Sequence, residues 1–304
     1  MPLILDTNVV RELGSGNLDV NNLISFRNEG GSIHLADGTA VELFEAIYSG
    51  RFDWAHWVRA KAQLRKIIDR DRPIMPGGRE LLTTIGIIDD RNLMAPQDVQ
   101  HILRECWAHV MKAKRVKDIK QLVMSALLEK GLHKVELNLG DGSRVIQANK
   151  SDWIESFERL GQASKSDGDS VRKVLARRGT DIHIGQENAK FVGQQLDSMV
   201  NTSFPRLSVR LDAMIRAHSL HTIRSLKPRE PYNPSKNVND AFDLDLLLYL
   251  AVPAAVCTND RRIHTVLKDT NSWQRFWVVR FDELSSTKNR QDLITIKWPA
   301  IFPS

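Results

Sequence analysis

Four acidic side chains in this sequence follow predicted strands closely enough to lie at one edge of a sheet. Asp6 ends the apolar run LILD, and Asp260 lies just past the run AAVCT. Glu42 lies early in the predicted helix after SIHLA, and Asp243 lies in the first turn of DAFDLDLLLYLAV. In a parallel sheet, the helix after a strand begins at that strand's carboxyl end, so all four carboxylates would converge on one crevice.

Such a cluster of like charges predicts a bound cation. Repulsion between carboxylates is unfavourable unless raised pKa values or a positive ion offset it. With no His or Cys set near these acids, their hard oxygen atoms favour Mg²⁺ or Mn²⁺ over Zn²⁺. Such an ion polarises a phosphodiester and generates hydroxide from bound water. The pattern therefore predicts hydrolysis of phosphodiester bonds.

Other acids compete for two of these positions. Glu45 lies one helical turn after Glu42 and is the second candidate for that position. Asp240 and Asp243 are three positions apart, share a helix face and resemble a capping box, whereas Asp245 points elsewhere. Asp240 and Asp245 are therefore alternatives or companions to Asp243.

Helix caps and turns explain part of the same pattern. Asp6 is a candidate N-cap for the helix after the first strand, although Thr7 or Asn8 is expected to cap more readily. The triplet TND at 258–260 is typical of a turn. Capping does not exclude metal binding, so these interpretations stand beside the predicted metal site.

The charge balance favours an anionic partner. The chain of 304 residues has 43 Lys and Arg against 37 Asp and Glu, which gives a net charge of +6 and a pI near 9.3. Nucleic acid is the usual partner of such a protein. The basic residues expected to contact its backbone are Arg224, Lys227, Arg261 and Arg262. A basic surface that holds the backbone is consistent with an acidic pocket that cuts it.

Composition argues against several other classes of protein. A hydrophobic content of 42% and a charged content of 26% are typical of soluble globular proteins. No apolar run approaches the roughly 20 residues that span a bilayer, and no secretory signal is visible, so no membrane partner is expected. Cys106 and Cys257 lack metal-site spacing and are too few for a disulfide framework. We therefore expect a cytoplasmic protein in a reducing compartment.

Strands and helices alternate at both ends of the chain. The apolar runs predict strands at 2–6, 32–36, 254–260, 277–284 and 293–300. Helices are expected at 20–28 and 37–50, and an amphipathic helix at 240–252. Residues 51–235 show long helical patterns, with a β-hairpin signal around Gly-Asp-Gly at 134–148. We expect an α/β domain of residues 1–50 and 236–304, with a parallel sheet flanked by helices, interrupted by a mainly α-helical insertion at 51–235.

Four segments in this order resemble a PIN domain, the nuclease fold of many prokaryotic toxin ribonucleases and RNA-processing enzymes. They are LILDTNVV, AVELFEA, DAFDLDLLLYLA and VCTNDRRI. The resemblance covers 1–50 and 236–304 and does not explain 51–235. It implies a PIN-like sheet in which Asp6, Glu42, Asp243 and Asp260 bind the metal. It also implies that Asn8 and Thr258 support the site, with Asn259 beside them.

The resemblance implies an endoribonuclease that uses Mg²⁺ or Mn²⁺ and leaves a 5′-phosphate and a 3′-hydroxyl. RNA is the expected substrate, and DNA is not excluded. In prokaryotes such proteins often act as toxins or defence effectors, so an inhibitor or regulatory protein is a further expected partner. The alternative is a catalytically inactive PIN-like module that binds nucleic acid or serves as a scaffold. In that case the insertion would assemble with a partner protein or with a second copy of the chain.

Overall fold

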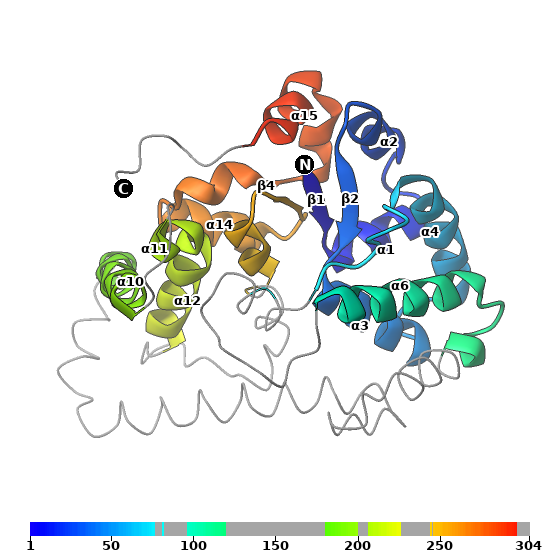
Figure 1. Ribbon diagram of the computed structural model, residues 1–304, viewed down its shortest axis with the longest axis horizontal. Coiled ribbons are helices and arrows are strands. Elements are labelled where there is room, and N and C mark those ends of the chain that lie inside the picture. The colour runs from blue at the N-terminus through cyan, green and yellow to red at the C-terminus, as the bar shows by residue number, and fades with distance from the viewer. Residues whose placement is uncertain are drawn as a thin grey trace. The chain divides into compact units, whose positions relative to one another are not determined.

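Within the part of the chain that the structure describes, four short parallel strands form one sheet (Figure 1). The computed structural model describes residues 1–76, 81, 96–119, 180–199, 206–225, 244 and 246–296. The strands are β1 (Pro2–Leu5), β2 (Ser32–Leu35), β3 (Ala255–Cys257) and β4 (Val278–Val279). Their order across the sheet is β2-β1-β3-β4, and every pairing is parallel.

The strand β1 lies in the interior of this sheet. Leu5 is opposite Leu35 on β2 and opposite Cys257 on β3. Leu3, Ile4 and Leu5 have no exposed surface. Parallel strands are covered on both faces, which is why β1 is a continuous apolar run rather than an alternating one. The expected α/β class with a parallel sheet is confirmed.

Contacts divide the chain into two compact units. The sheet unit contains Met1–Ile146, Pro253–Asn259 and Trp277–Lys297. The helical unit contains Gln147–Val252, Asp260–Phe276 and Trp298–Ser304. The division differs from the expected one, since the insertion was predicted to begin at residue 51.

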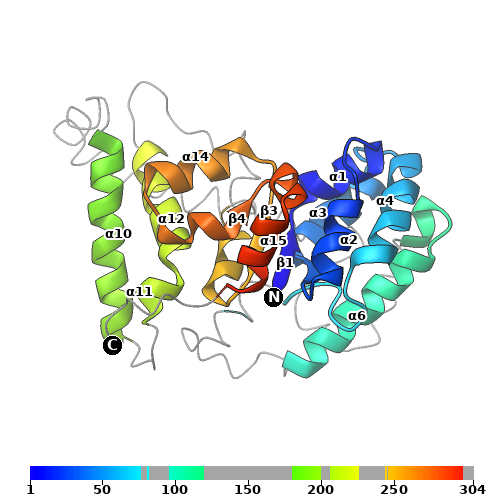
Figure 2. The same cartoon turned by 90° about the horizontal axis from the view of Figure 1, so that it is seen from above.

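Helices surround the strands in the sheet unit (Figures 1 and 2). They are α1 (Thr7–Ser15), α2 (Asn21–Asn28), α3 (Asp37–Tyr48), α4 (Trp54–Ile67), α6 (Pro96–Lys112), the 3₁₀ helix η4 (Phe281–Ser285) and α15 (Thr287–Ile294). Trp57 and Leu64 of α4 belong to the same hydrophobic core as Leu3 and Leu5 of β1. The described part of 51–119 therefore packs with the sheet, because the apolar face of α4 is buried against α1.

Two basic side chains of α4 hold the C-terminal end of α6. The Lys61 Nζ atom donates a hydrogen bond of 2.7 Å to the Ala113 carbonyl, and Arg65 donates to the Met111 carbonyl. The last carbonyls of a helix have no partner within it, so cations at this end are favourable. Burial lowers the pKa of Lys61, and the charge of Arg65 lowers it further.

The helical unit is assembled from short and long helices. They are α10 (Thr180–Met199), α11 (Leu207–Arg210), α12 (Asp212–Ser225), η2 (Leu246–Ala251), α14 (Arg261–Asp269) and η3 (Trp273–Trp277), whose last residue belongs to the sheet unit. The helices α10 and α12 lie side by side (Figure 2). Arg224 of α12 bonds Asp181 of α10 at 3.0 Å and Asp269 of α14 at 2.6 Å. This three-residue bridge joins three helices.

Some elements differ from their sequence predictions. Within the expected amphipathic helix 240–252, the described residues Leu246–Ala251 form a 3₁₀ helix with every side chain buried. The run LLLYLA has no polar face to expose, so it packs on all sides. In the strand expected at 293–300, Leu293 and Ile294 instead end the helix α15, whose start is capped by the Ser286 hydroxyl. The hairpin expected at 134–148 lies outside the described residues.

In the part of the chain that the structure describes, no helix is both long enough and apolar enough to cross a bilayer.

Candidate functional site

Asp6 is a buried carboxylate at the carboxyl end of β1. Its side chain is 6% exposed, and its Oδ1 atom accepts a hydrogen bond of 2.5 Å from the Thr7 amide. Asp6 has extended backbone angles and is the N-cap of α1, whereas Thr7 already lies in the helix. The expectation that Thr7 or Asn8 would cap this helix is therefore wrong. A cap must be the last residue before the helical turn, and Asp6 holds that place.

Asp6, Asn8 and Thr258 form a closed triangle of hydrogen bonds. Asp6 Oδ2 accepts from Asn8 Nδ2 at 2.6 Å and from Thr258 Oγ1 at 2.6 Å. Asn8 Nδ2 also lies 3.2 Å from Thr258 Oγ1, which completes the triangle. The structure therefore brings two of the expected supporting residues, Asn8 and Thr258, into contact with Asp6.

The triangle lies where the strand order reverses. From β1 the chain continues to β2 on one side, whereas β3 pairs with the other side of β1 and leads to β4. The amide of Asp6 donates to the Cys257 carbonyl at 3.1 Å, so the ends of β1 and β3 are held together. Open α/β sheets bind their ligands outside the carboxyl ends of strands at this kind of position.

Asn259 connects the triangle to two other elements. Its amide donates to Asn8 Oδ1 at 3.2 Å, and its side chain donates to Glu12 Oε2 at 2.7 Å. Its side-chain oxygen accepts from the Phe281 amide at 3.1 Å. Glu12 was not predicted as a site residue. The one signal for it is its place four residues after Asn8, on the same face of α1.

Glu42 reaches the same end of the sheet from α3. Its Oε2 atom accepts a hydrogen bond of 2.6 Å from Thr7 Oγ1, next to the Asp6 cap in the chain. Thr7 is 5% exposed, so this bond is largely screened from water. Sequence reasoning considered Thr7 only as a cap and missed its contact with Glu42. The competing acid, Glu45, lies in the same helix.

Of the remaining predicted acids, Asp260 lies within the described residues. Asp260 is the N-cap of α14, and its Oδ1 atom accepts from the Arg262 amide at 2.7 Å. The sequence pattern predicts a turn at this triplet or a metal ligand at Asp260, and the capping role is not among these interpretations. Three acids, Asp243, Asp240 and Asp245, lie outside the described residues. Among the residues that are described, no three or more His, Cys, Asp or Glu side chains form a group that could hold a metal ion.

Both cysteines are poor candidates for nucleophiles or thiolate ligands. Burial raises the pKa of the Cys257 thiol far above its ordinary range, and the nearby Asp6 charge raises it further. Burial raises the pKa of Cys106 to about 11, with a smaller contribution from Glu105. The thiolate is the reactive form of cysteine, so both side chains are protonated and inert at neutral pH.

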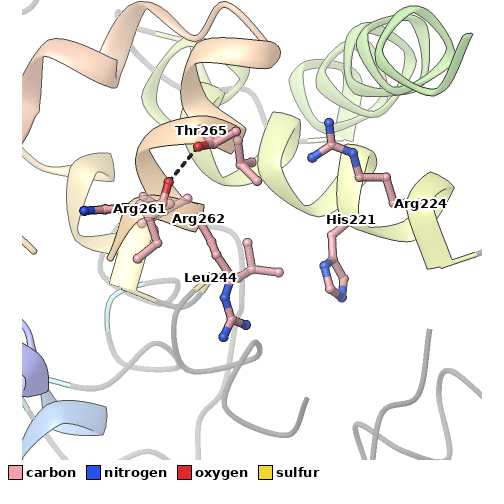
Figure 3. Close-up of a pocket in the computed structure, with 9 residues that line it drawn as sticks. His221, Arg224, Leu244, Arg261, Arg262 and Thr265 are labelled. Atoms are coloured by element: carbon pink, nitrogen blue, oxygen red, sulfur yellow. Dashed lines mark hydrogen bonds between the residues drawn. The ribbon is translucent and has the colours of Figure 1, made fainter. Parts of the chain in front are cut away.

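The predicted basic residues meet in the helical unit. Arg224, Arg261 and Arg262 all line one pocket with a volume of about 340 Å³ (Figure 3). The fourth, Lys227, lies outside the described residues. No sequence pattern indicated that these residues would surround a cavity, since α12 and α14 are far apart in the chain.

Comparison of the chain with protein-family models, with curated proteins and with solved structures gave no match in any of the three.

Proposed function

We propose that this chain is a metal-dependent endoribonuclease with a PIN-like nuclease domain. The observation that carries the proposal is the position of Asp6, a buried carboxylate at the reversal point of a parallel sheet. Glu42 accepts a hydrogen bond from Thr7, the residue that follows Asp6 in the chain. Asp243 and Asp260 are retained as further metal ligands on the ground of the sequence resemblance alone.

The donor atoms around Asp6 suit a hard divalent cation. Asp6 and Glu42 supply carboxylate oxygens, which are ligands preferred by Mg²⁺ and Mn²⁺, whereas Asn8 and Thr258 direct their N–H and O–H donors to Asp6. Each carboxylate oxygen accepts about two hydrogen bonds. Asn8 and Thr258 fill this capacity at Oδ2, so we assign Oδ1 of Asp6 and the carboxylate of Glu42 to the cation. When bound, the ion would polarise the phosphodiester and acidify an attacking water.

The surrounding side chains fix the orientation of Asp6. Asn8 and Thr258 each donate a hydrogen bond to its Oδ2 atom. Asn259 in turn donates to Asn8 and to Glu12, so it holds the donor in place. Such supporting contacts are expected to matter for metal affinity almost as much as the ligands themselves.

The biological setting follows from the same resemblance. A net charge of +6 supports attraction to an RNA backbone. We propose a cytoplasmic toxin or defence effector whose activity is restrained by an inhibitor or regulatory protein. DNA is the second substrate to be tested.

The test is cleavage of a mixed RNA pool, and of DNA of matched length, with Mg²⁺, with Mn²⁺ and with a chelator. The Asp6→Asn variant should lose more than about 10²-fold in rate, since it removes a proposed ligand. The matched control is Asp71→Asn, which makes the same charge change at an exposed position of the sheet unit. Equal cleavage by the parent and Asp6→Asn, or none with either metal, would refute the proposal.

A second candidate function is an inactive nucleic-acid-binding or scaffold module. The observation that favours it is that donors from Thr7, Asn8 and Thr258 all engage Asp6, as in a purely structural clamp. In this case Asp6→Asn would bind RNA as tightly as the parent and would differ from it only in stability. A filter-binding assay beside the cleavage assay separates the two functions.

A further inference from the structure

The end of α6 meets α4 in the sheet unit, and both stretches of chain are basic (Figures 1 and 2). The helix α4, WAHWVRAKAQLRKI, contains four Lys and Arg residues and no acidic one. The run KAKRVKD at 112–118 contains four more, with one acid, Asp118. Hydrogen bonds from Lys61 to the Ala113 carbonyl and from Arg65 to the Met111 carbonyl hold the two stretches together. We call this region the α4–α6 junction.

The backbone that carries the lysines of this run is held on both sides. Lys112 lies between the two residues whose carbonyls α4 binds. Further along the chain, Asp118 Oδ2 accepts from the amides of Lys114 and Arg115, at 3.1 and 2.9 Å. A fixed backbone restricts where these side chains can lie, so less entropy is lost when they bind a ligand.

Two of these lysines carry charges that no described carboxylate pairs. The one acid of the run, Asp118, is used by Arg115, whose Nη2 atom lies 3.1 Å from the Asp118 Oδ1 atom. Lys112 and Lys114 are exposed, and neither forms an ion pair with a residue that the structure describes. Both ammonium groups are therefore available to an anion from solution.

Arg65 adds a third exposed cation to the junction. Its Nη2 atom donates to a carbonyl, which leaves its charge in place, and a guanidinium has five N–H donors in all. Burial lowers the pKa of Lys61, and the charge of Arg65 lowers it further. The positive charges of α4 thus repel each other, and a bound anion would relieve that repulsion.

The side chains at this surface suit phosphate groups better than bases. Among the side chains that the structure describes in the sheet unit, Val58 is the one large hydrophobic group that is exposed. No described aromatic ring there is exposed for a base to stack on. A surface that enters a lipid bilayer needs several apolar side chains, which a single valine does not supply. Contacts from lysine and arginine to phosphate carry no sequence information.

We propose that the α4–α6 junction binds the phosphate backbone of single-stranded RNA through Arg65, Lys112 and Lys114. The choice of RNA rests on the proposed ribonuclease function, and single-stranded DNA offers the same phosphate groups. These residues differ from the basic residues expected from the sequence, which line the pocket in the helical unit. The junction holds the strand without reading its bases.

Fluorescence anisotropy with labelled oligouridine tests the proposal on the full chain, in the presence of a chelator that prevents metal-dependent cleavage. The titrations are repeated over a series of salt concentrations, because each phosphate contact releases counterions and makes binding salt-dependent. Oligoadenosine of the same length should bind within about threefold of oligouridine, since the phosphates are identical. Oligodeoxythymidine distinguishes the sources: equal binding identifies any single strand as the ligand, and weaker binding identifies RNA.

The decisive variant is Lys112→Gln/Lys114→Gln, which removes two exposed charges and no described hydrogen bond of either side chain. At about 0.1 M salt it should weaken oligouridine binding by about tenfold or more, and the slope of log K against log salt should become shallower by about 1.4. Arg65 is left in place because its replacement would also remove the bond to the Met111 carbonyl.

The matched control is Lys190→Gln/Lys288→Gln, which makes the same charge change at exposed positions of α10 and α15. It should change the affinity by less than about twofold and leave the slope unaltered, because no phosphate contact is lost. A second variant, Lys112→Glu/Lys114→Glu, reverses both charges and should weaken binding further. Circular dichroism checks that all variants are folded.

Several outcomes would overturn the inference. They are no binding of any oligonucleotide, binding that does not depend on salt, and equal effects of the junction variant and its control. Displacement of oligouridine by polyglutamate at equal charge would also overturn it and would assign the surface to an acidic protein segment.

The cleavage assay fails independently of this one. Binding through the junction without cleavage by the parent protein would refute the ribonuclease alone. Cleavage by the parent, with unchanged binding by Lys112→Gln/Lys114→Gln, would refute the junction alone.

Discussion

Thr258 Oγ1 donates a hydrogen bond of 2.6 Å to Asp6 Oδ2, and the two residues are 252 positions apart in the chain. Thr258 has no exposed surface, and Asp6 is 6% exposed, so water competes little for this contact. The bond joins the ends of β1 and β3, which pair in parallel just before it. It therefore holds the candidate site together and fastens the end of β3 to the end of β1.

Replacement of Thr258 by valine should destabilise the protein by about 1.5–3 kcal/mol, the range for hydrogen bonds to charged groups. Valine keeps the shape of threonine but leaves the Asp6 carboxylate short of a donor. The measurement is urea denaturation at pH 7. Thr295→Val is the matched control, because its hydroxyl is exposed and bonds only to carbonyls of its own helix. A change for Thr258→Val no larger than that of the control would contradict this role.

Much of the sheet and part of the candidate site could be predicted from local patterns. The strands β1, β2 and β3 are short apolar runs followed by polar residues, and a buried parallel strand has this pattern. Asp6 could be assigned to the edge where parallel strand ends meet. Asn8 and Thr258 are assigned to the site through the resemblance to a PIN domain. In these cases the local signal and the tertiary structure agree.

Other features depend on contacts that local patterns do not encode. Glu12 looks like a solvated helix residue, and only the pairing of β1 with β3 brings Asn259 to it. The apolar face of α4 could pack equally well in a separate helical domain or against the sheet. The sequence pattern therefore did not show that Trp57 belongs to the core of the sheet unit. The pocket at Arg262 forms where α12 and α14 pack together. These helices are far apart in the sequence, so no local pattern predicts their contact.

Lys61→Met should destabilise the sheet unit by about 1–3 kcal/mol, because the buried Ala113 carbonyl loses its donor while the apolar stem is kept. Lys66→Met is the matched control on the same helix. Its Nζ atom is exposed and bonds Gln63 at 3.1 Å, so a change within about 0.5 kcal/mol is expected. Denaturation midpoints of the two variants give the comparison. Equal effects would show that Lys61 does not cap α6.

Gln274→Leu should be among the most destabilising single changes in the helical unit. Gln274 has no exposed surface, accepts from the Ala213 amide at 2.8 Å, and donates to the Leu250 carbonyl at 2.7 Å and the Arg210 carbonyl at 3.0 Å. Leucine would leave all three backbone groups, of which the Arg210 carbonyl is only partly buried, without this partner, at about 1–3 kcal/mol for each buried group.

Thermal and chemical unfolding of Gln274→Leu should therefore show a loss of more than about 3 kcal/mol. Gln291→Leu provides the control, because this exposed side chain makes one hydrogen bond of 3.1 Å, to Glu29. It should stay within about 0.5 kcal/mol of the parent. A loss for Gln274→Leu as small as that of the control would mean that water or rearranged backbone replaces its bonds.

The stability of the helical unit should fall as the pH drops from about 6.5 toward 4. Burial lowers the pKa of His218 to about 4, helped by His221, and burial lowers the pKa of His221 to about 4, helped by Arg224. In the unfolded chain both should titrate near 6.5, so between these values the unfolded state binds more protons than the folded state. Each histidine then contributes a loss of up to about 1.4 kcal/mol per pH unit.

The experiment compares urea unfolding of the parent and a His218→Gln/His221→Gln variant at intervals from pH 7.5 to pH 4.5. The variant starts less stable at pH 7.5, because it loses packing, but its stability should fall less steeply with decreasing pH. Burial also lowers the pKa of His34 in the sheet unit, so some pH dependence should survive in the variant. Parallel slopes for the two proteins would show that His218 and His221 do not carry this dependence.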